Sequence, residues 1–150
     1  MLDVFSRYKR LRSGSLKLVL IGKSAIELPE SDDIVYLGFV SDEMKFSLMR
    51  EALALVLFSK YESLSLVVLE SMLMGRPVLV NGKCQVLKEH CIQSNAGFYF
   101  MNEREFDAEL DYLQLHEREY RIMCENGKRY VRENYRWEDV MNRIMNLIEG

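Results

Sequence analysis

The stretch 61–80 constrains the fold more than any other part of the sequence. The run 66–74 is almost wholly apolar, and Gly75 follows it, a residue that readily takes the left-handed conformation closing a helix. Pro77 prevents the helix from continuing, and the apolar run 78–80 then has the character of a buried strand. The stretch therefore predicts a short helix that leads directly into a buried strand.

Two glutamates frame the start of this predicted helix. Glu62 lies just before the helix, and Glu70 lies about one turn inside it. The first backbone N–H groups of a helix lack intrahelical partners and attract anions, so the N–H groups near Ser65, Leu66 and Val67 predict an anion site. Carboxylates beside an anion site suit a ligand with both phosphate and hydroxyl groups, and a nucleoside-diphosphate sugar fits that description.

Short apolar runs alternate with helical patterns along most of the chain. Strands are predicted at 16–22, 34–38, 54–58, 78–80 and 97–100. Helices are predicted at 1–15, after the capping serine Ser41, over the central stretch, at 84–92, and from 103 to the last amphipathic segment at 137–148. This order predicts an α/β fold: a Rossmann-like, doubly wound parallel sheet with a helical C-terminal tail over 103–150.

Composition narrows the class of protein. With 150 residues, of which 49% are hydrophobic and 29% charged, the chain is expected to form one globular domain over 1–150. A net charge of −3 gives no support to nucleic-acid binding, and no apolar run approaches the roughly 20 residues of a membrane span. Three cysteines without zinc-like spacing favour inert thiols in a reducing cytosol over a metal or redox site at Cys91. We assign no role to His90 or His116.

Five pieces of the chain, in this order, carry a family resemblance: 18–22, 34–44, 61–78, 96–100 and the closing Tyr135-Arg136-Trp137. Together they resemble the C-terminal, donor-binding half of a retaining GT-B glycosyltransferase, of the large group often called family 4. The resemblance implies transfer of a hexose from a UDP-sugar or GDP-sugar to a glycan or lipid-linked acceptor, as in polysaccharide biosynthesis. It also implies that neither a metal nor a cofactor is needed.

The resemblance assigns roles to individual residues. Glu62 would face the transferred sugar as the catalytic residue, and Glu70 would accept hydrogen bonds from the ribose hydroxyls. The N–H groups at Ser65, Leu66 and Val67 would hold the diphosphate, which is also the leaving group. The other donor-binding candidates lie at strand ends and in the turn that reads the base, and are Gly22, Lys23, Val40, Asp42 and Lys45. A solvated side chain is the competing interpretation for Glu62 and for each lysine.

The chain also departs from the family pattern. Glu62-Ser63-Leu64-Ser65 stands where the family commonly has Glu-Gly-Phe-Gly, and serines restrict the backbone freedom that glycines give. The strand with the basic pair that grips pyrophosphate, and the N-terminal acceptor-binding domain, are expected to be missing. We therefore expect a fragment or subunit that transfers sugar only when joined to its N-terminal half.

We expect a cytoplasmic enzyme that contacts the inner face of the membrane peripherally in its full-length form. The basic cluster at 7–12 would contact acidic lipid or the missing half, although a solvated helix face is the default interpretation. Two alternatives stay open: a non-catalytic nucleotide-binding subunit of a split transferase, and a domain that self-associates through its last helix. A nucleotide-sugar epimerase on the same fold is a remoter one.

Overall fold

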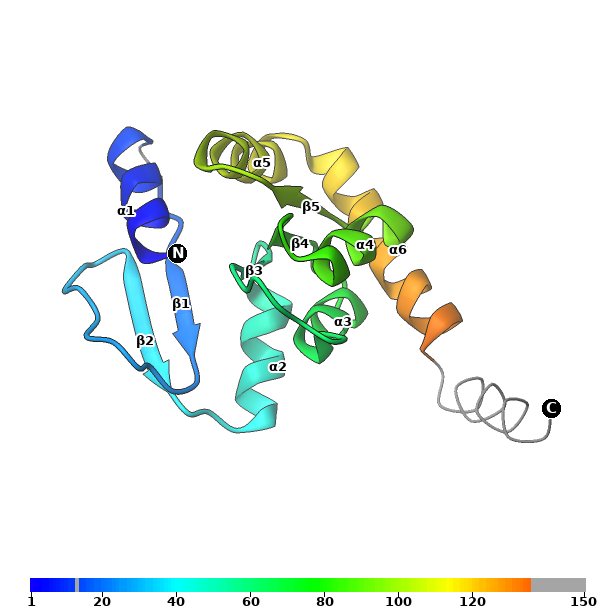
Figure 1. Cartoon of the computed structure of the whole chain (residues 1–150), viewed down its shortest axis with the longest axis horizontal. Coiled ribbons are helices and arrows are strands. Elements are labelled where there is room, and N and C mark those ends of the chain that lie inside the picture. Colours follow the sequence, from blue (N-terminus) through cyan, green and yellow to red (C-terminus); the bar gives the residue numbers. More distant parts are fainter. Residues whose placement is uncertain (13, 136–150) are drawn as a thin grey trace. The chain divides into compact units, whose positions relative to one another are not determined.

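The computed structural model describes residues 1–12 and 14–135 (Figure 1). The chain divides into two compact units, Met1–Leu48 and Met49–Gly150, and each is described by itself. The closing aromatic signature extends beyond the described residues, and the last amphipathic helix predicted at 137–148 lies wholly outside them.

The first unit contains a helix and a pair of parallel strands. Helix α1 (Leu2–Leu11) is followed by strands β1 (Leu18–Ile21) and β2 (Ile34–Gly38). The two strands run parallel, with Leu18 beside Ile34 at one end and Ile21 beside Gly38 at the other. Both strands therefore end at the same edge, as the alternation of apolar runs predicts.

Polar contacts fix the starts and ends of the two helices that begin in this unit. Lys9 of α1 places its Nζ 2.9 Å from the Asp33 carboxylate, and it donates to the Leu16 carbonyl at 2.9 Å. One member of the predicted basic cluster is thus paired inside its own unit. Helix α2 (Asp42–Glu51) begins after Ser41, whose hydroxyl accepts a hydrogen bond from the Met44 N–H at 3.2 Å, so the predicted cap is confirmed.

The second unit is built around a three-stranded parallel sheet in the order β3-β4-β5. Its strands are β3 (Leu55–Leu57), β4 (Val78–Asn81) and β5 (Gly97–Phe100), and all four residues of central β4 are buried. Its helices are α3 (Leu66–Leu73), α4 (Gln85–Ser94), α5 (Glu103–Leu115) and α6 (Glu117–Asn134). The predicted parallel α/β fold is confirmed, with its strands paired as a two-stranded and a three-stranded sheet.

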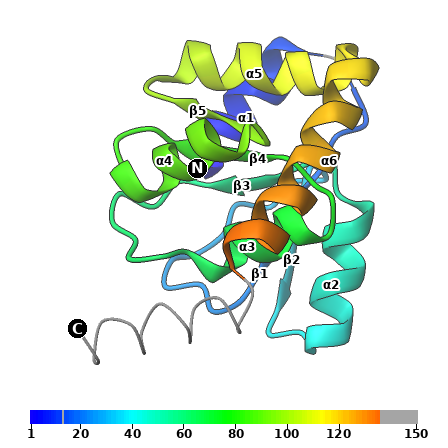
Figure 2. The ribbon, with the colours of Figure 1, turned by 90° about the vertical axis from the view of Figure 1, so that its right-hand side faces the viewer.

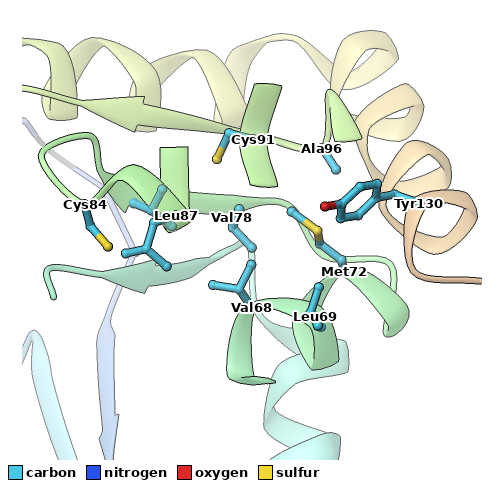
Figure 3. Close-up of a cluster of buried hydrophobic side chains, with 10 residues drawn as sticks. Val68, Leu69, Met72, Val78, Cys84, Leu87, Cys91, Ala96 and Tyr130 are labelled. Carbon is cyan, nitrogen blue, oxygen red and sulfur yellow. The ribbon is translucent and has the colours of Figure 1, made fainter. Parts of the chain in front are cut away.

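The core of the second unit lies between α3, α4, α6 and the sheet. Val68 and Met72 of α3 and Leu87 of α4 are completely buried, and Tyr130 reaches into the same cluster from α6 (Figure 3). Helix α3 packs along α6 (Figure 2). The apolar side of α3 thus holds the helix firmly against its neighbours, and this fixes the position of its first turn.

Cysteines and the helix end behave as the sequence suggests. Cys84 and Cys91 are buried free thiols in the core, and burial raises the pKa of Cys91 to about 12, which fits an inert thiol. Gly75 has a φ of +73°, so the left-handed end of α3 is confirmed.

No helix in the described part of the chain combines the length and apolarity needed to cross a membrane.

Candidate functional site

The start of α3 has an unusual backbone. Ser65, the residue before the helix, has a φ of 60° and a ψ of 70°, a left-handed conformation that non-glycine residues rarely adopt. Its carbonyl accepts the first intrahelical hydrogen bonds, from the N–H groups of Val68 at 3.0 Å and Leu69 at 3.4 Å. The N–H groups of Leu66 and Val67 precede these bonds, and they are therefore the donors that the helix leaves unused.

The hydroxyl of Ser65 is buried next to this helix start. The residue is 7% exposed, and its Oγ is buried without a hydrogen-bond partner in the described chain. The hydroxyl does not cap the helix, because the left-handed backbone directs it away from the usual capping geometry. A buried polar group without a partner costs about 1–3 kcal/mol.

Both predicted carboxylates belong to the same unit as this helix start. Glu70 lies within α3 and Glu62 in the loop before it, and both side chains are partly buried. The loop begins at the carboxyl end of β3, where Asn81 at the end of β4 donates from Nδ2 to the Phe58 carbonyl at 3.1 Å. The carboxyl ends of two neighbouring strands are thereby joined beside the candidate site, as expected for ligand sites of parallel sheets.

The remaining predicted residues lie in the first unit. The Gly22 N–H donates to the Gly38 carbonyl at 2.7 Å, so the ends of β1 and β2 meet. Lys23 is exposed beyond this junction. A pocket of about 920 Å³, lined by the start of α1, the end of β1 and the loop 22–30, includes both Gly22 and Lys23.

The turn that leads into α2 carries a local ion pair. Lys45 Nζ lies 3.2 Å from Asp42 Oδ1, with side chains 22% and 86% exposed, and it also lies 4.5 Å from the centre of the Phe46 ring. Val40, two residues after β2, is partly buried. Because the Asp42 side chain is mostly exposed, this pair is a weak surface ion pair.

Three residues that stabilise these loops were not predicted as functional. Tyr36 donates to the Gly22 carbonyl at 2.9 Å and accepts from the Ser24 N–H at 3.1 Å, which fixes the turn after β1. Asn81 joins two strand ends, as described above. His90 in α4 contacts the Leu64 carbonyl through Nε2 at 2.8 Å. No sequence spacing indicates these contacts, because their partners are far apart along the chain.

A metal was not expected at this site. Within the residues that the structure describes, no three His, Cys, Asp or Glu side chains are grouped to hold a metal ion. The donors at the start of α3 are N–H and O–H groups, which contact an anion directly. Metal-independent chemistry stays a prediction.

Comparison with known proteins gives a family and a fold. Residues 1–114 match the sequence model of the family described as "Glycosyl transferases group 1". No curated protein sequence matches the chain. A solved sucrose-phosphate synthase from Thermosynechococcus elongatus is similar with a TM-score of 0.63 and 20% identity, over 79% of this chain and 30% of its own.

A second solved structure is similar over more of the chain. It is WaaG, a glycosyltransferase involved in lipopolysaccharide biosynthesis, with a TM-score of 0.61 and 15% identity over 90% of this chain and 48% of its own. The chain thus spans less than half the length of either solved protein. At these identities the likeness shows the fold.

Proposed function

Because the chain belongs to the group 1 glycosyl transferases, we propose that it is the donor-binding half of a glycosyltransferase. It binds a nucleoside-diphosphate sugar, and the complete enzyme transfers the hexose, with retention of configuration, to a glycan or lipid-linked acceptor. The donor is a UDP-sugar or a GDP-sugar. The acceptor is bound by an N-terminal domain.

The start of α3 is the observation that carries this proposal. The N–H groups of Leu66 and Val67 and the buried, unpartnered hydroxyl of Ser65 offer three donors at one helix end. The positive end of the helix dipole favours an anion there, and a diphosphate supplies enough oxygens for all three donors. Such fixed donors also stabilise the charge that develops on a leaving diphosphate.

The carboxylates complete the donor site in this proposal. Glu70 accepts hydrogen bonds from the ribose hydroxyls, since a carboxylate can accept from two donors at once. Glu62 faces the transferred sugar, where it holds hydroxyl groups and stabilises positive charge on the ring. By the family resemblance, Asp42 and Val40 read the base, and Lys45, Gly22 and Lys23 are the further donor-binding residues of the proposal.

The test is a titration of the 150-residue chain with UDP, GDP and ADP, followed through backbone amide NMR shifts. We expect one of UDP and GDP to bind and to shift the amides of Leu66 and Val67. Ser65→Ala should weaken that binding about tenfold, the effect of one hydrogen bond to a charged group. Ser63→Ala is the matched control, because it removes an exposed hydroxyl from the same loop.

The proposal fails if neither UDP nor GDP binds, including after the N-terminal half is supplied. If Ser65→Ala and Ser63→Ala weaken nucleotide binding equally, the Ser65 hydroxyl does not contact the ligand. Glu70→Ala gives an independent check: it should weaken binding of the nucleotide and leave binding of inorganic diphosphate unchanged, because only the nucleotide carries ribose.

A second candidate is a nucleotide-binding subunit without catalysis. It is favoured by Ser63 and Ser65, which stand where the family pattern has glycines and restrict the backbone freedom of the loop. Glu62→Gln separates the two candidates in the joined enzyme. A catalytic Glu62 predicts a fall in kcat of about 100-fold with an unchanged nucleotide Kd. A non-catalytic subunit shows no transfer by either protein.

A further inference from the structure

A buried histidine lies directly behind the loop that carries Glu62. His90 of α4 is 4% exposed, and both of its ring nitrogens have partners. Nε2 lies 2.8 Å from the Leu64 carbonyl, and Nδ1 lies 3.1 Å from the Tyr130 hydroxyl. A carbonyl can only accept, so the Nε2 proton is the donor in the first of these bonds.

The second nitrogen connects His90 to α6. With its proton on Nε2, the imidazole presents Nδ1 as an acceptor to the Tyr130 hydroxyl, whose one hydrogen is shared between Nδ1 and Gln93 Oε1. That hydroxyl lies 3.3 Å from the Tyr135 hydroxyl and 3.2 Å from Gln93 Oε1. The His90 ring also packs edge-on against the Tyr130 ring, with centroids 6.0 Å apart. These contacts with Tyr130 therefore hold the imidazole in place, with Nε2 directed at the Leu64 carbonyl.

The Leu64 carbonyl is the atom through which His90 holds the loop that carries Glu62. The described chain ties the loop to neighbouring elements by hydrogen bonds at its two ends, Phe58 with Asn81 and Leu64 with His90. The Leu64 side chain is 39% exposed and provides limited packing. The next residue, Ser65, has a left-handed backbone, and such a conformation persists only where the surrounding structure enforces it.

We propose that His90 is a positioning residue of the donor site. By holding the Leu64 carbonyl, it sets the direction in which Glu62 approaches the ligand and enforces the left-handed backbone of Ser65. It thereby preorganises the donors at the start of α3, which is how an enzyme limits the ordering cost of binding. This inference rests on the proposed function, because it concerns the same site.

Two substitutions of His90 test the contacts of its two ring nitrogens separately. In His90→Gln the side-chain amide nitrogen reaches the place of Nε2 and can still donate to Leu64. In His90→Asn the shorter amide reaches only the place of Nδ1, so the contact with Leu64 is lost while a polar contact with Tyr130 remains. Tyr130→Phe is the converse control, since it removes the hydroxyl and leaves the bond to Leu64.

The experiment compares these variants in the full 150-residue chain. UDP and GDP affinities are measured by titration, and the free proteins are compared through the amide shifts of residues 62–67. We expect His90→Asn to move these amides and to weaken nucleotide binding about tenfold. His90→Gln should restore the amide shifts and bring the affinity within about threefold of the parent chain. Melting temperatures of all variants show whether the fold is kept.

The affinities, amide shifts and melting temperatures of the variants distinguish a positioning histidine from one that only stabilises the fold. If the Asn and Gln variants lower the melting temperature equally and leave affinity and loop amides at parental values, the inference is wrong while the proposed function stands. Equal losses of affinity in both variants would also overturn it, because the Leu64 bond would then be irrelevant. If the parent chain binds neither nucleotide, the proposed function fails, and unchanged loop amides in His90→Asn would still overturn the positioning role.

Discussion

Ser65 combines two features that each oppose folding in the free protein. Its left-handed backbone costs a non-glycine residue about 1–3 kcal/mol, and its buried hydroxyl lacks a partner among the described residues. Residues that break a local rule of folding in this way are usually found at functional sites. Stability and binding should therefore respond in opposite directions when Ser65 is changed.

We expect Ser65→Gly to raise the free energy of unfolding by about 1 kcal/mol, because glycine accepts a positive φ and brings no hydroxyl. Ser65→Ala should gain less, since alanine loses only the unpaired hydroxyl. Urea unfolding of the parent and both variants measures the difference. Exposed Ser63→Gly serves as the control and should not stabilise the protein. A destabilised Ser65→Gly would show that the serine is not strained.

Glu109 predicts a pH dependence of stability. Burial, and then the nearby charge of Glu105, raise the pKa of Glu109 from 4.5 to about 7. The folded protein thus holds this proton more tightly than the unfolded chain does. Stability from this group is fully present below about pH 4.5 and is lost as the pH rises toward about 7.

Glu109→Gln should remove that decline, because glutamine has no proton to lose. The free energy of unfolding of the variant, measured at intervals between about pH 4.5 and 7, should change less with pH than that of the parent. Glu133→Gln, a change at an exposed position of α6, should leave the parental slope. The same slope in the Glu109 variant would contradict the assignment.

Among the elements, β4 and β5 pack so closely that a larger side chain does not fit at one position between them. Strand β4 is the central strand, and its Val78 pairs with Gly97 of β5. A Cβ added at Gly97 would overlap the Val78 carbonyl oxygen and lie 2.8 Å from the Val78 nitrogen. Those atoms belong to backbone within the sheet, so they cannot move aside as a flexible side chain can.

Gly97→Ala should therefore lower the free energy of unfolding by about 3 kcal/mol, at the upper end of the usual cost of overpacking. Denaturant unfolding followed by circular dichroism measures this loss. Gly14→Ala is the matched control, since a Cβ at Gly14 meets nothing within 4 Å. Equal stability of the two variants would show that β5 can shift away from β4.

The same elements show how much the sequence can predict. Runs such as 78–80 and the helix closed by Gly75 were predicted because their signals are local: apolar periodicity, a capping serine, a glycine end. Glu62 and Glu70 were correctly assigned to opposite sides of the start of α3 for the same reason. Their ligand roles stay predictions.

Contacts between distant residues could not be predicted this way. His90 and Leu64 are 26 residues apart, and nothing in either neighbourhood indicates the other. Asn81 meets Phe58 only because β3 and β4 are neighbours in the sheet. The left-handed backbone of Ser65 was also missed, since serine does not signal it. Such features arise from packing, which a single sequence does not encode as a local pattern.

For the whole molecule, we expect binding without transfer. The chain spans 30% and 48% of two solved proteins of similar fold, and the proposal places the acceptor on another domain. Holding both reactants together contributes effective concentrations of about 10⁵–10⁸ M, which a donor half alone lacks. The chain should bind its nucleotide sugar and release no nucleotide, whereas the joined enzyme should release it with an acceptor present. Nucleotide release by the chain alone, at a rate similar to that of the joined enzyme, would contradict the division of roles.

The rates at which the free cysteines are alkylated can report how the second unit opens. Only a thiolate reacts quickly with an alkylating reagent, and burial raises the pKa of both Cys91 and Cys124. Cys91 lies in the core cluster, whereas Cys124 is a partly buried residue of α6. Labelling of Cys124 ahead of Cys91 would therefore show that Cys124 reacts without opening of the core, and labelling of Cys91 would then record the opening of the core itself. Simultaneous labelling would instead reveal one cooperative unit.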